Sequence, residues 1–264
     1  MRATFRADER QTLVGPRGVR SLHHLPRGGE PAADGALVVV LPGLGLPGYT
    51  LPTADAIAAR GIECAVLDVP GFGSSQPRSA RPHIEAVGAL AAQWVAQVAE
   101  DRPVVVLGHS TGAQAALATA LALEPRRALA LVMAGPTFRP EHRHVLRLLG
   151  ATPLAYRKDR LAEVDVREVL RARLDLVRLV VSGVRDVPEA RIAALAAPVT
   201  LIAGEHDSYA PREWLAALAD AASRSTRVRT AVVHGSHNNL YTHPDELADA
   251  VLLALADARG RSGA

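Results

Sequence analysis

The hydrophobic residues of this chain gather in short continuous runs that alternate with amphipathic segments. A run such as ALVVVL at 36–41 is too short for a buried helix and is expected for a strand covered on both faces. Similar runs recur in five further segments: ECAVLDV (63–69), PVVVLG (103–108), ALALVMA (128–134), PVTLIAG (198–204) and RTAVVH (229–234). The segments between them predict helices over about 49–60, 84–99, 111–123, 212–222 and 244–257.

Strands that alternate with helices of this length predict an α/β fold with a mostly parallel, doubly wound sheet. The segment QTLVGPRGVRSLHHL at 11–25 contains a turn at 15–18 between two short strand patterns, so an antiparallel hairpin is expected before the first buried strand. Together with the six buried runs, this gives a sheet of about eight strands.

One part of the chain departs from the alternation. Residues 137–190 contain several successive helical patterns and no strand, so we predict a helical cap that divides the core into residues 1–136 and 191–264. Apolar residues recur there at helical spacing, and we expect part of this stripe to pack on the core and part to roof a substrate pocket: Val166, Val169, Leu170, Leu174 and Val177. A peripheral extension without a function is the alternative.

Composition narrows the class of protein. With 48% hydrophobic and 22% charged residues the chain is typical of globular proteins, and its apolar runs are too short to span a membrane. The first residues lack the apolar core of a signal peptide and Cys64 is the single cysteine, so a cytoplasmic protein is expected. The net charge is +3, but basic residues alternate with acidic ones, so neither a nucleic acid nor a membrane is expected as a partner.

The sequence Gly108-His109-Ser110-Thr111-Gly112 stands between a predicted strand and a predicted helix. A Gly-x-Ser-x-Gly sequence in this position is the signature of a tight turn that projects the serine at the edge of the sheet, where glycines relieve clashes. Ser110 is therefore the candidate nucleophile, with the N–H groups of the following helix available to developing negative charge.

A serine nucleophile needs a base, and the base needs an orienting acid. Asp207 follows the strand at 198–204, and Glu205 is a second acid in the same loop. His237 lies in the loop before the last predicted helix, and His234 and His243 are alternative bases on either side of it.

The chain resembles the α/β-hydrolase superfamily, specifically its capped members. The resemblance covers nearly the whole chain and rests on LPGLG, LDVPGFGSS, GHSTG, GEHDSYAP and HGSHNNLYTHPDELADAV in this order. It implies that Ser110 is the nucleophile, His237 the general base and acid, and Asp207 its orienting partner.

The oxyanion hole of such an enzyme needs two backbone donors. The resemblance implies the N–H groups of Thr111 and Leu44, although this chain has Pro42-Gly43 where the family often has His-Gly. The glycine-rich stretch PGLGLPG at 42–48 contains no phosphate-binding motif, so nucleotide binding is not expected. Three residues beside the predicted site are candidates for pocket lining: Gly43, His109 and His206.

The predicted reaction is hydrolysis of a small carboxylic ester with an apolar portion, through an acyl-enzyme and without a cofactor or metal. Hydrolysis of a C–C bond in ring-cleavage products, or of a thioester or lactone, is the alternative, because one fold hosts all of these activities. A small-molecule binding protein on the same scaffold is a further alternative from a different class.

Overall fold

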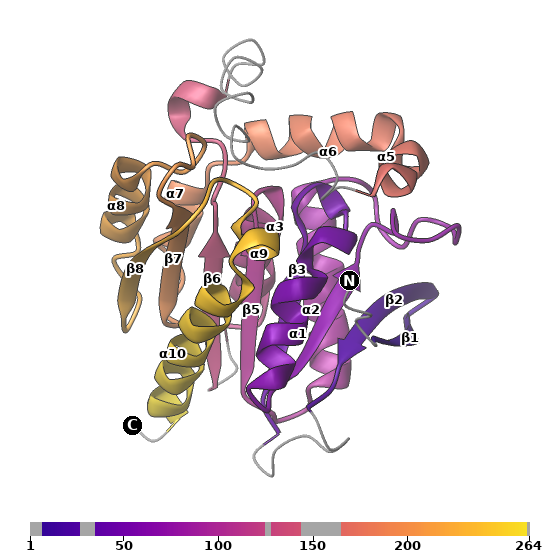
Figure 1. Cartoon of the computed structure of the whole chain (residues 1–264), viewed down its shortest axis with the longest axis horizontal. Coiled ribbons are helices and arrows are strands. Elements are labelled where there is room, and N and C mark those ends of the chain that lie inside the picture. The colour runs from indigo at the N-terminus through magenta and orange to yellow at the C-terminus, as the bar shows by residue number, and fades with distance from the viewer. Residues whose placement is uncertain (1–6, 27–34, 125–127, 144–164, 263–264) are drawn as a thin grey trace.

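The computed structural model describes residues 7–26, 35–124, 128–143 and 165–262, which are built around one eight-stranded sheet (Figure 1). The strand order is β1-β2-β4-β3-β5-β6-β7-β8. The strands are β1 (Asp8–Val14), β2 (Arg17–His24), β3 (Leu37–Leu41), β4 (Glu63–Asp68), β5 (Val104–His109), β6 (Leu129–Ala134), β7 (Val199–Gly204) and β8 (Val228–Val233). β2 pairs antiparallel with β1 and β4, and every other pairing is parallel, so the predicted hairpin and the mostly parallel sheet are both confirmed.

The helices of the core cover both faces of this sheet. They are α1 (Leu51–Ala59), α2 (Ile84–Val98), α3 (Thr111–Ala122), α8 (Arg212–Ala221), the short α9 (Asn239–Thr242) and α10 (Pro244–Ser262). Helices α1 and α10 pack against each other on one face, and α2 and α3 pack together on the other (Figure 1). Every residue of β3 to β7 is buried, as expected for strands that are covered on both sides.

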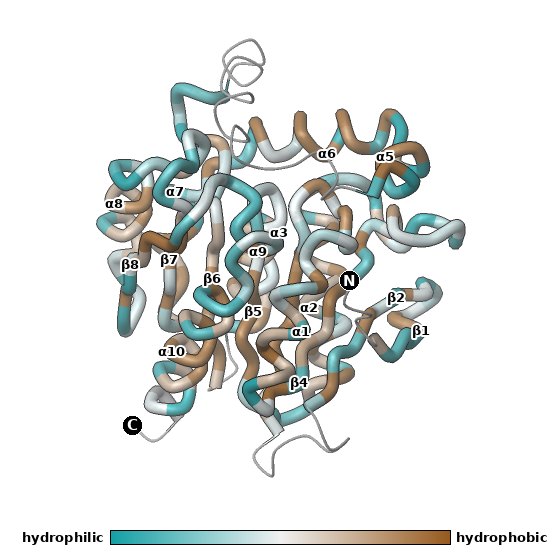
Figure 2. The backbone as a smooth tube through the Cα atoms, viewed as in Figure 1, coloured by the Kyte–Doolittle hydropathy of each residue, from teal (hydrophilic) through white to brown (hydrophobic). Residues whose placement is uncertain are grey.

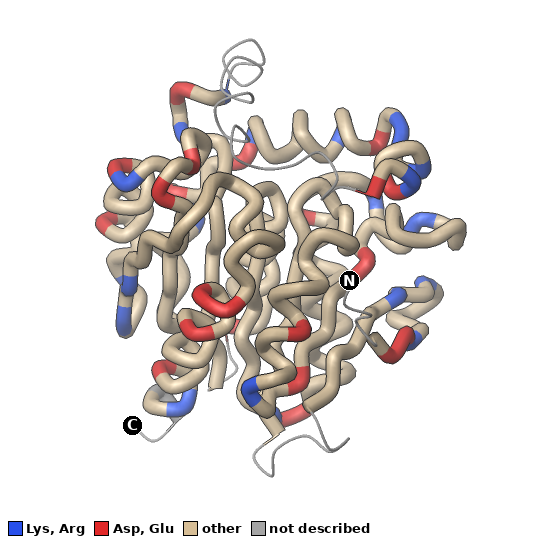
Figure 3. Tube along the Cα trace, viewed as in Figure 1, with Lys and Arg blue, Asp and Glu red and all other residues tan. Residues whose placement is uncertain are grey.

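Charged residues lie mainly at the periphery of the molecule, and the strands β3, β5 and β6 with helix α3 carry none (Figure 3). Among the described helices, none is both long and apolar enough to cross a membrane.

Between β6 and β7 the described residues form the 3₁₀ turn Pro140–His142 and the helices α5 (Val166–Ala172), α6 (Leu174–Arg185) and α7 (Pro188–Ile192). Helices α5 and α6 lie across the carboxyl ends of the strands (Figure 1). A helical insertion after β6 is therefore present, as predicted, although residues 144–164 of the expected cap lie outside the described residues. The division into residues 1–136, 137–190 and 191–264 stays a prediction. Helices α5 and α6 are separated by a sharp turn at Arg173, whose φ is 49°.

The orientation of these two helices differs from our expectation. Val166, Leu170 and Leu174 of the apolar stripe are 64%, 67% and 71% exposed, so these side chains neither pack on the core nor roof an enclosed pocket. Figure 2 shows hydrophobic residues recurring along the outer side of α6. The buried residues of α5 and α6 are instead Glu168, Ala172, Leu179, Ser182 and Gly183.

Small residues face the core because α6 approaches it closely. A Cβ atom at Gly183 would lie 2.5 Å from Cε2 of Phe138, and the Gly183 carbonyl accepts a hydrogen bond from Nε2 of Gln114 on α3. The Ser182 hydroxyl accepts the Ile84 N–H at the start of α2. Close approach and hydrogen bonding at these small residues, together with the buried side chain of Leu179, therefore fix α6 on the core.

Candidate functional site

Ser110 occupies the strained turn that the sequence predicts. Its φ of 56° and ψ of −125° lie where a non-glycine residue is rarely found. The two flanking glycines permit this turn: a Cβ at Gly108 would lie 2.2 Å from the Gly112 carbonyl oxygen, and one at Gly112 would lie 2.1 Å from the Leu41 carbonyl oxygen. Ser110 is 8% exposed and precedes the first turn of α3, whose N–H groups have no partner within the helix.

His237 and Asp207 form a buried pair at the same edge of the sheet. His237 Nδ1–H donates to Asp207 Oδ2 over 2.9 Å, and the N–H groups of Tyr209 and Ala210 donate to Asp207 Oδ1. Burial alone would raise the pKa of Asp207, but the attraction of His237 and these hydrogen bonds outweigh it and lower the pKa below its ordinary value. Asp207 is therefore ionised and orients the imidazole with the His237 Nε2 atom turned away from the carboxylate.

Gly135, at the end of β6, makes room for this pair. Its φ is +52°, and a Cβ there would lie 3.1 Å from the His237 ring and 3.2 Å from Asp207 Oδ2. A larger residue would therefore press on both members of the pair.

The competing candidates for acid and base lie elsewhere. His234 is exposed and bonds to Glu246 through Nδ1, and His243 Nδ1 contacts the Thr242 hydroxyl. Glu205 lies 3.6 Å from His206 Nε2 and is much more exposed than Asp207. Of the residues that the sequence left open, the structure brings only Asp207 and His237 together.

His237 is also connected to the glycine-rich loop, through residues to which the sequence assigned no such role. His109 Nε2–H donates to the His237 carbonyl over 2.8 Å, the Tyr49 hydroxyl donates to His109 Nδ1 over 2.7 Å, and the Gly43 N–H donates to Tyr49 Oη over 2.7 Å. Burial, and next the proximity of His237, lower the pKa of His109 to about 3, so its ring stays neutral. Tyr49 was missed, because nothing in its local sequence indicates a partner 60 residues away.

The proposed pocket-lining residues have different environments. Gly43 lies against Ser110, since a Cβ there would be 2.9 Å from the Ser110 Cβ. His109 is buried and its ring lies 4.8 Å from that of His237, centroid to centroid. His206 is half-buried, and its N–H donates to the Gly235 carbonyl. Their role as pocket lining stays a prediction.

The two residues predicted to supply the oxyanion donors, Leu44 and Thr111, are in contact. Leu44 adopts a φ of 53° within the short 3₁₀ turn Gly43–Gly45, and its N–H donates to Thr111 Oγ1 over 2.7 Å. The loop after β3 is thus in contact with the start of α3, next to Ser110.

A second serine–histidine–carboxylate arrangement is present away from this edge, on β2 and β4. The Ser21 hydroxyl lies 3.0 Å from His23 Nε2, and His23 Nδ1 lies 2.8 Å from Glu63 Oε1. All three residues are buried, and Arg102 also binds Glu63. The hydrogen bond with His23, and next that with Arg102, hold the pKa of the Glu63 carboxyl at about 2. The Ser21 hydroxyl is fully buried, so this group joins β2 to β4 inside the sheet and is not open to a substrate.

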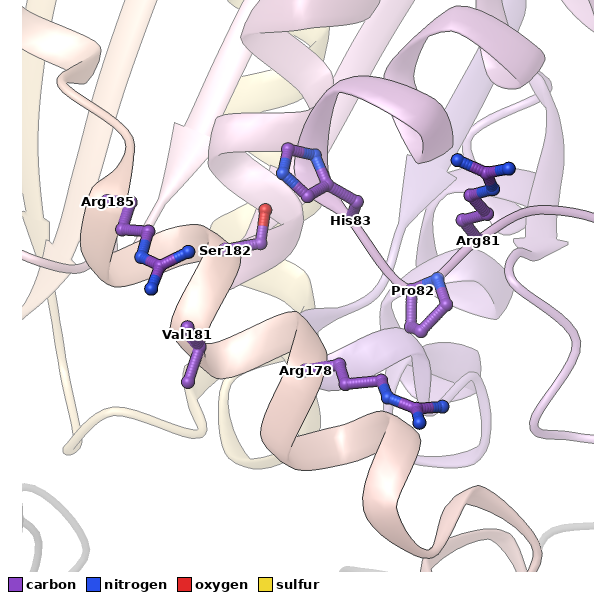
Figure 4. A pocket seen from close by; sticks show the side chains of 7 residues that line it. All are labelled: Arg81, Pro82, His83, Arg178, Val181, Ser182 and Arg185. Carbon is purple, nitrogen blue, oxygen red and sulfur yellow. The ribbon is translucent and has the colours of Figure 1, made fainter.

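An open groove of about 440 Å³ lies where α6 meets the start of α2 (Figure 4). Its lining residues are Arg81, Pro82, His83, Arg178, Val181, Ser182 and Arg185, and none of them belongs to the Ser110 site. Within the described part of the chain, no group of three or more His, Cys, Asp or Glu residues is arranged to hold a metal ion.

Comparison with known proteins finds solved structures and a protein sequence that are similar to this chain. One solved structure, a serine hydrolase involved in carbazole degradation (the CarC enzyme), is 18% identical with a TM-score of 0.70, covering 95% of this chain and 99% of that one. A thioesterase domain from the curacin biosynthetic pathway is 16% identical with a TM-score of 0.63, covering 94% of this chain and 99% of that one. At such identities the likeness shows a shared fold.

A closer sequence match is shorter. A spectinabilin polyketide synthase system protein, NorC of Streptomyces orinoci, is 47% identical over 74 residues, which are 28% of this chain and 3% of that relative. This chain therefore spans a small part of the length of that protein. The profile of the alpha/beta hydrolase family matches residues 38–250, and the chain belongs to this family.

Proposed function

We propose that the protein is a serine hydrolase that cleaves a small carboxylic ester through Ser110, His237 and Asp207. The observation that carries the proposal is the buried 2.9 Å contact between His237 Nδ1 and Asp207 Oδ2, at the edge where the strained turn presents Ser110. A binding protein needs no oriented imidazole beside a strained serine, so this arrangement favours catalysis over binding.

In the proposed reaction, His237 Nε2 accepts the proton of the Ser110 hydroxyl while Oγ attacks the ester carbonyl carbon. The oxygen of the tetrahedral intermediate lies near the N–H of Thr111 and the loop that contains Leu44. The His237 proton then passes to the leaving alcohol and leaves an acyl-enzyme, which water hydrolyses by the same steps. Asp207 stays ionised throughout and holds the tautomer of His237.

The second candidate substrate is a thioester, with the same residues in the same roles. Two likenesses support this candidate: the fold shared with a thioesterase domain from the curacin biosynthetic pathway, and the 47% identity over 74 residues to a polyketide synthase system protein. In either case we expect the substrate to be a small molecule with an apolar portion.

Labelling of Ser110 by a fluorophosphonate tests the proposal. We expect the wild-type protein to become labelled, with the adduct located at Ser110 by mass spectrometry, and Ser110→Ala to remain unlabelled. Ser223→Ala, at an exposed serine just beyond α8, is the matched control and should label at the wild-type rate. A folded wild-type protein without label at Ser110 would show that the protein is a binder.

A substrate panel then chooses between the candidates. The panel contains p-nitrophenyl acetate, butyrate and octanoate, the N-acetylcysteamine thioesters of the same acids, and a ring-cleavage dienoate. We expect the three p-nitrophenyl esters to be cleaved, and kcat/KM is compared across the panel. A kcat/KM for thioesters at least tenfold above that for the matching esters would replace the ester proposal by the thioesterase candidate.

A further inference from the structure

The oxyanion loop is the loop after β3 that contains Leu44. The N–H group of Leu44 already has a hydrogen-bond acceptor, so it is not a free backbone donor as predicted from the sequence. The Leu44 N–H is 2.7 Å from the side-chain oxygen of Thr111 and donates to it. Leu44 is thus joined to the reacting centre through the side chain of the residue that follows Ser110.

The loop is held rigidly in this arrangement. The Gly45 N–H donates to the Pro42 carbonyl, the Leu46 N–H donates to the Gly43 carbonyl, and the Gly43 N–H donates to Tyr49 Oη. Gly112 places the start of α3 so close to the loop that a Cβ there would meet the Leu41 and Pro42 carbonyl oxygens. Thr111 is the first residue of α3 and is buried, so its hydroxyl is confined beside Leu44 of the loop.

The chemistry of a hydroxyl gives this contact a direction. An N–H group can only donate, so Thr111 Oγ1 is the acceptor toward Leu44, and its own proton is available to another acceptor. A donor that already accepts a hydrogen bond is polarised and donates more strongly. Ser110 is the preceding residue, so a tetrahedral oxygen held by the Thr111 N–H forms beside the same side chain.

We propose that the Thr111 hydroxyl is a donor of the oxyanion hole, placed between the Leu44 N–H and the substrate oxygen. Thr111 then supplies two donors, its N–H and its O–H, and Leu44 is a positioning residue that acts through the hydroxyl. The inference rests on the proposed serine hydrolase function and adds a catalytic residue to it.

Two substitutions at this position test the inference. Thr111→Val keeps the shape of the side chain and removes the hydroxyl, whereas Thr111→Ser keeps the hydroxyl and removes a buried methyl group. The measurements are the second-order rate constant for inactivation by a fluorophosphonate, whose adduct carries a tetrahedral oxygen, and kcat and KM for p-nitrophenyl butyrate.

We expect Thr111→Val to lower the inactivation rate constant and kcat by about 10²-fold, as for the loss of one oxyanion donor, with little change in KM. Thr111→Ser should retain most of the wild-type rate. A purely structural role of Thr111 also makes valine worse than serine, because the valine variant leaves the Leu44 N–H without its acceptor. That role predicts rate constants that fall only together with Tm and a KM that changes as well, whereas an oxyanion donor predicts a loss in kcat beyond any loss in Tm. Thermal unfolding of both variants measures that structural effect separately.

The outcomes distinguish a failure of this inference from a failure of the proposed function. A Thr111→Val protein that is labelled at the wild-type rate or faster would overturn the inference, because the Leu44 N–H would then serve the oxyanion directly once the hydroxyl is gone. A wild-type protein that is not labelled at Ser110 would overturn the proposed function, and the inference with it.

Discussion

Glu168 of α5 is expected to make the stability of this protein depend on pH in an unusual direction. Its side chain is buried, with 6% exposed, and its carboxylate oxygens accept the Gly48 N–H over 3.2 and 3.3 Å. Burial, above all, and the neighbouring Asp165 and Asp68 raise its pKa from 4.5 to about 7, although the hydrogen bond from Gly48 and the charge of Arg171 act in the opposite direction.

The size and sign of the effect follow from this shift. The folded protein holds the proton of Glu168 more tightly than the unfolded chain does, so the contribution to stability is complete below pH 4.5 and is lost as the pH rises to about 7. The shift from 4.5 to about 7, at ~1.4 kcal/mol per pH unit, corresponds to about 3 kcal/mol. Above pH 7 the folded state therefore carries a buried charge that costs this free energy.

The substitution Glu168→Gln removes the ionisation and keeps a carbonyl oxygen for the Gly48 N–H. We expect the variant and the wild type to differ little in Tm at pH 5, and the variant to unfold at a higher temperature at pH 8.5. At ~2 °C per kcal/mol for a chain of this size, the difference should grow by about 6 °C between the two pH values.

Thermal unfolding of both proteins at pH 5, 6, 7 and 8.5 measures this difference. Glu213→Gln, at an exposed glutamate in the first turn of α8, is the matched control, and its Tm difference should not change with pH. A Tm difference between Glu168→Gln and the wild type that is the same at all four pH values would refute the reasoning.

Two further substitutions, each with a control, test the predicted role of Asp207 and the tight turn at Ser110. Asp207→Asn should leave the fold intact and lower kcat by up to ~10⁴-fold in ester hydrolysis, because the imidazole then takes the wrong tautomer. Glu205→Gln should keep wild-type activity. Equal losses of activity in both variants would mean that Asp207 is not the orienting acid. Gly112→Ala should lower Tm sharply in thermal unfolding, because its Cβ would lie 2.1 Å from the Leu41 carbonyl oxygen, while Gly260→Ala in α10, with no atom within 4 Å, should be neutral or slightly stabilising. A Gly112→Ala protein of unchanged Tm would mean that the turn at Ser110 has more room than the structure gives it.

The sequence by itself determined the order of strands and helices and the conformation at Ser110. Buried runs such as 36–41 and helices such as the one predicted at 84–99 are recorded in local periodicity, and the structure has β3 and α2 there. The turn at Ser110 is local on one side, because Gly108 is required by the Gly112 carbonyl and the Ala116 side chain at the start of the following helix. Gly112, in contrast, is required by the Leu41 and Pro42 carbonyls at the end of β3, so its reason lies in the packing of two distant segments.

Apart from Asp207 and His237, which the sequence led us to expect as partners, the tertiary structure decided which distant groups of the site meet. The contact of Tyr49 with His109 and that of Leu44 with Thr111 join residues 60 and 67 positions apart, and neither pair has a pattern that would reveal it in one sequence. The orientation of α6 was likewise not readable from its apolar stripe, because an amphipathic pattern predicts that one side is buried but does not say how closely the helix must approach its neighbours. Here the approach to Phe138 leaves no room for a side chain at position 183, so Gly183 faces the core beside Ser182 and Leu179, and the exposed stripe faces outward.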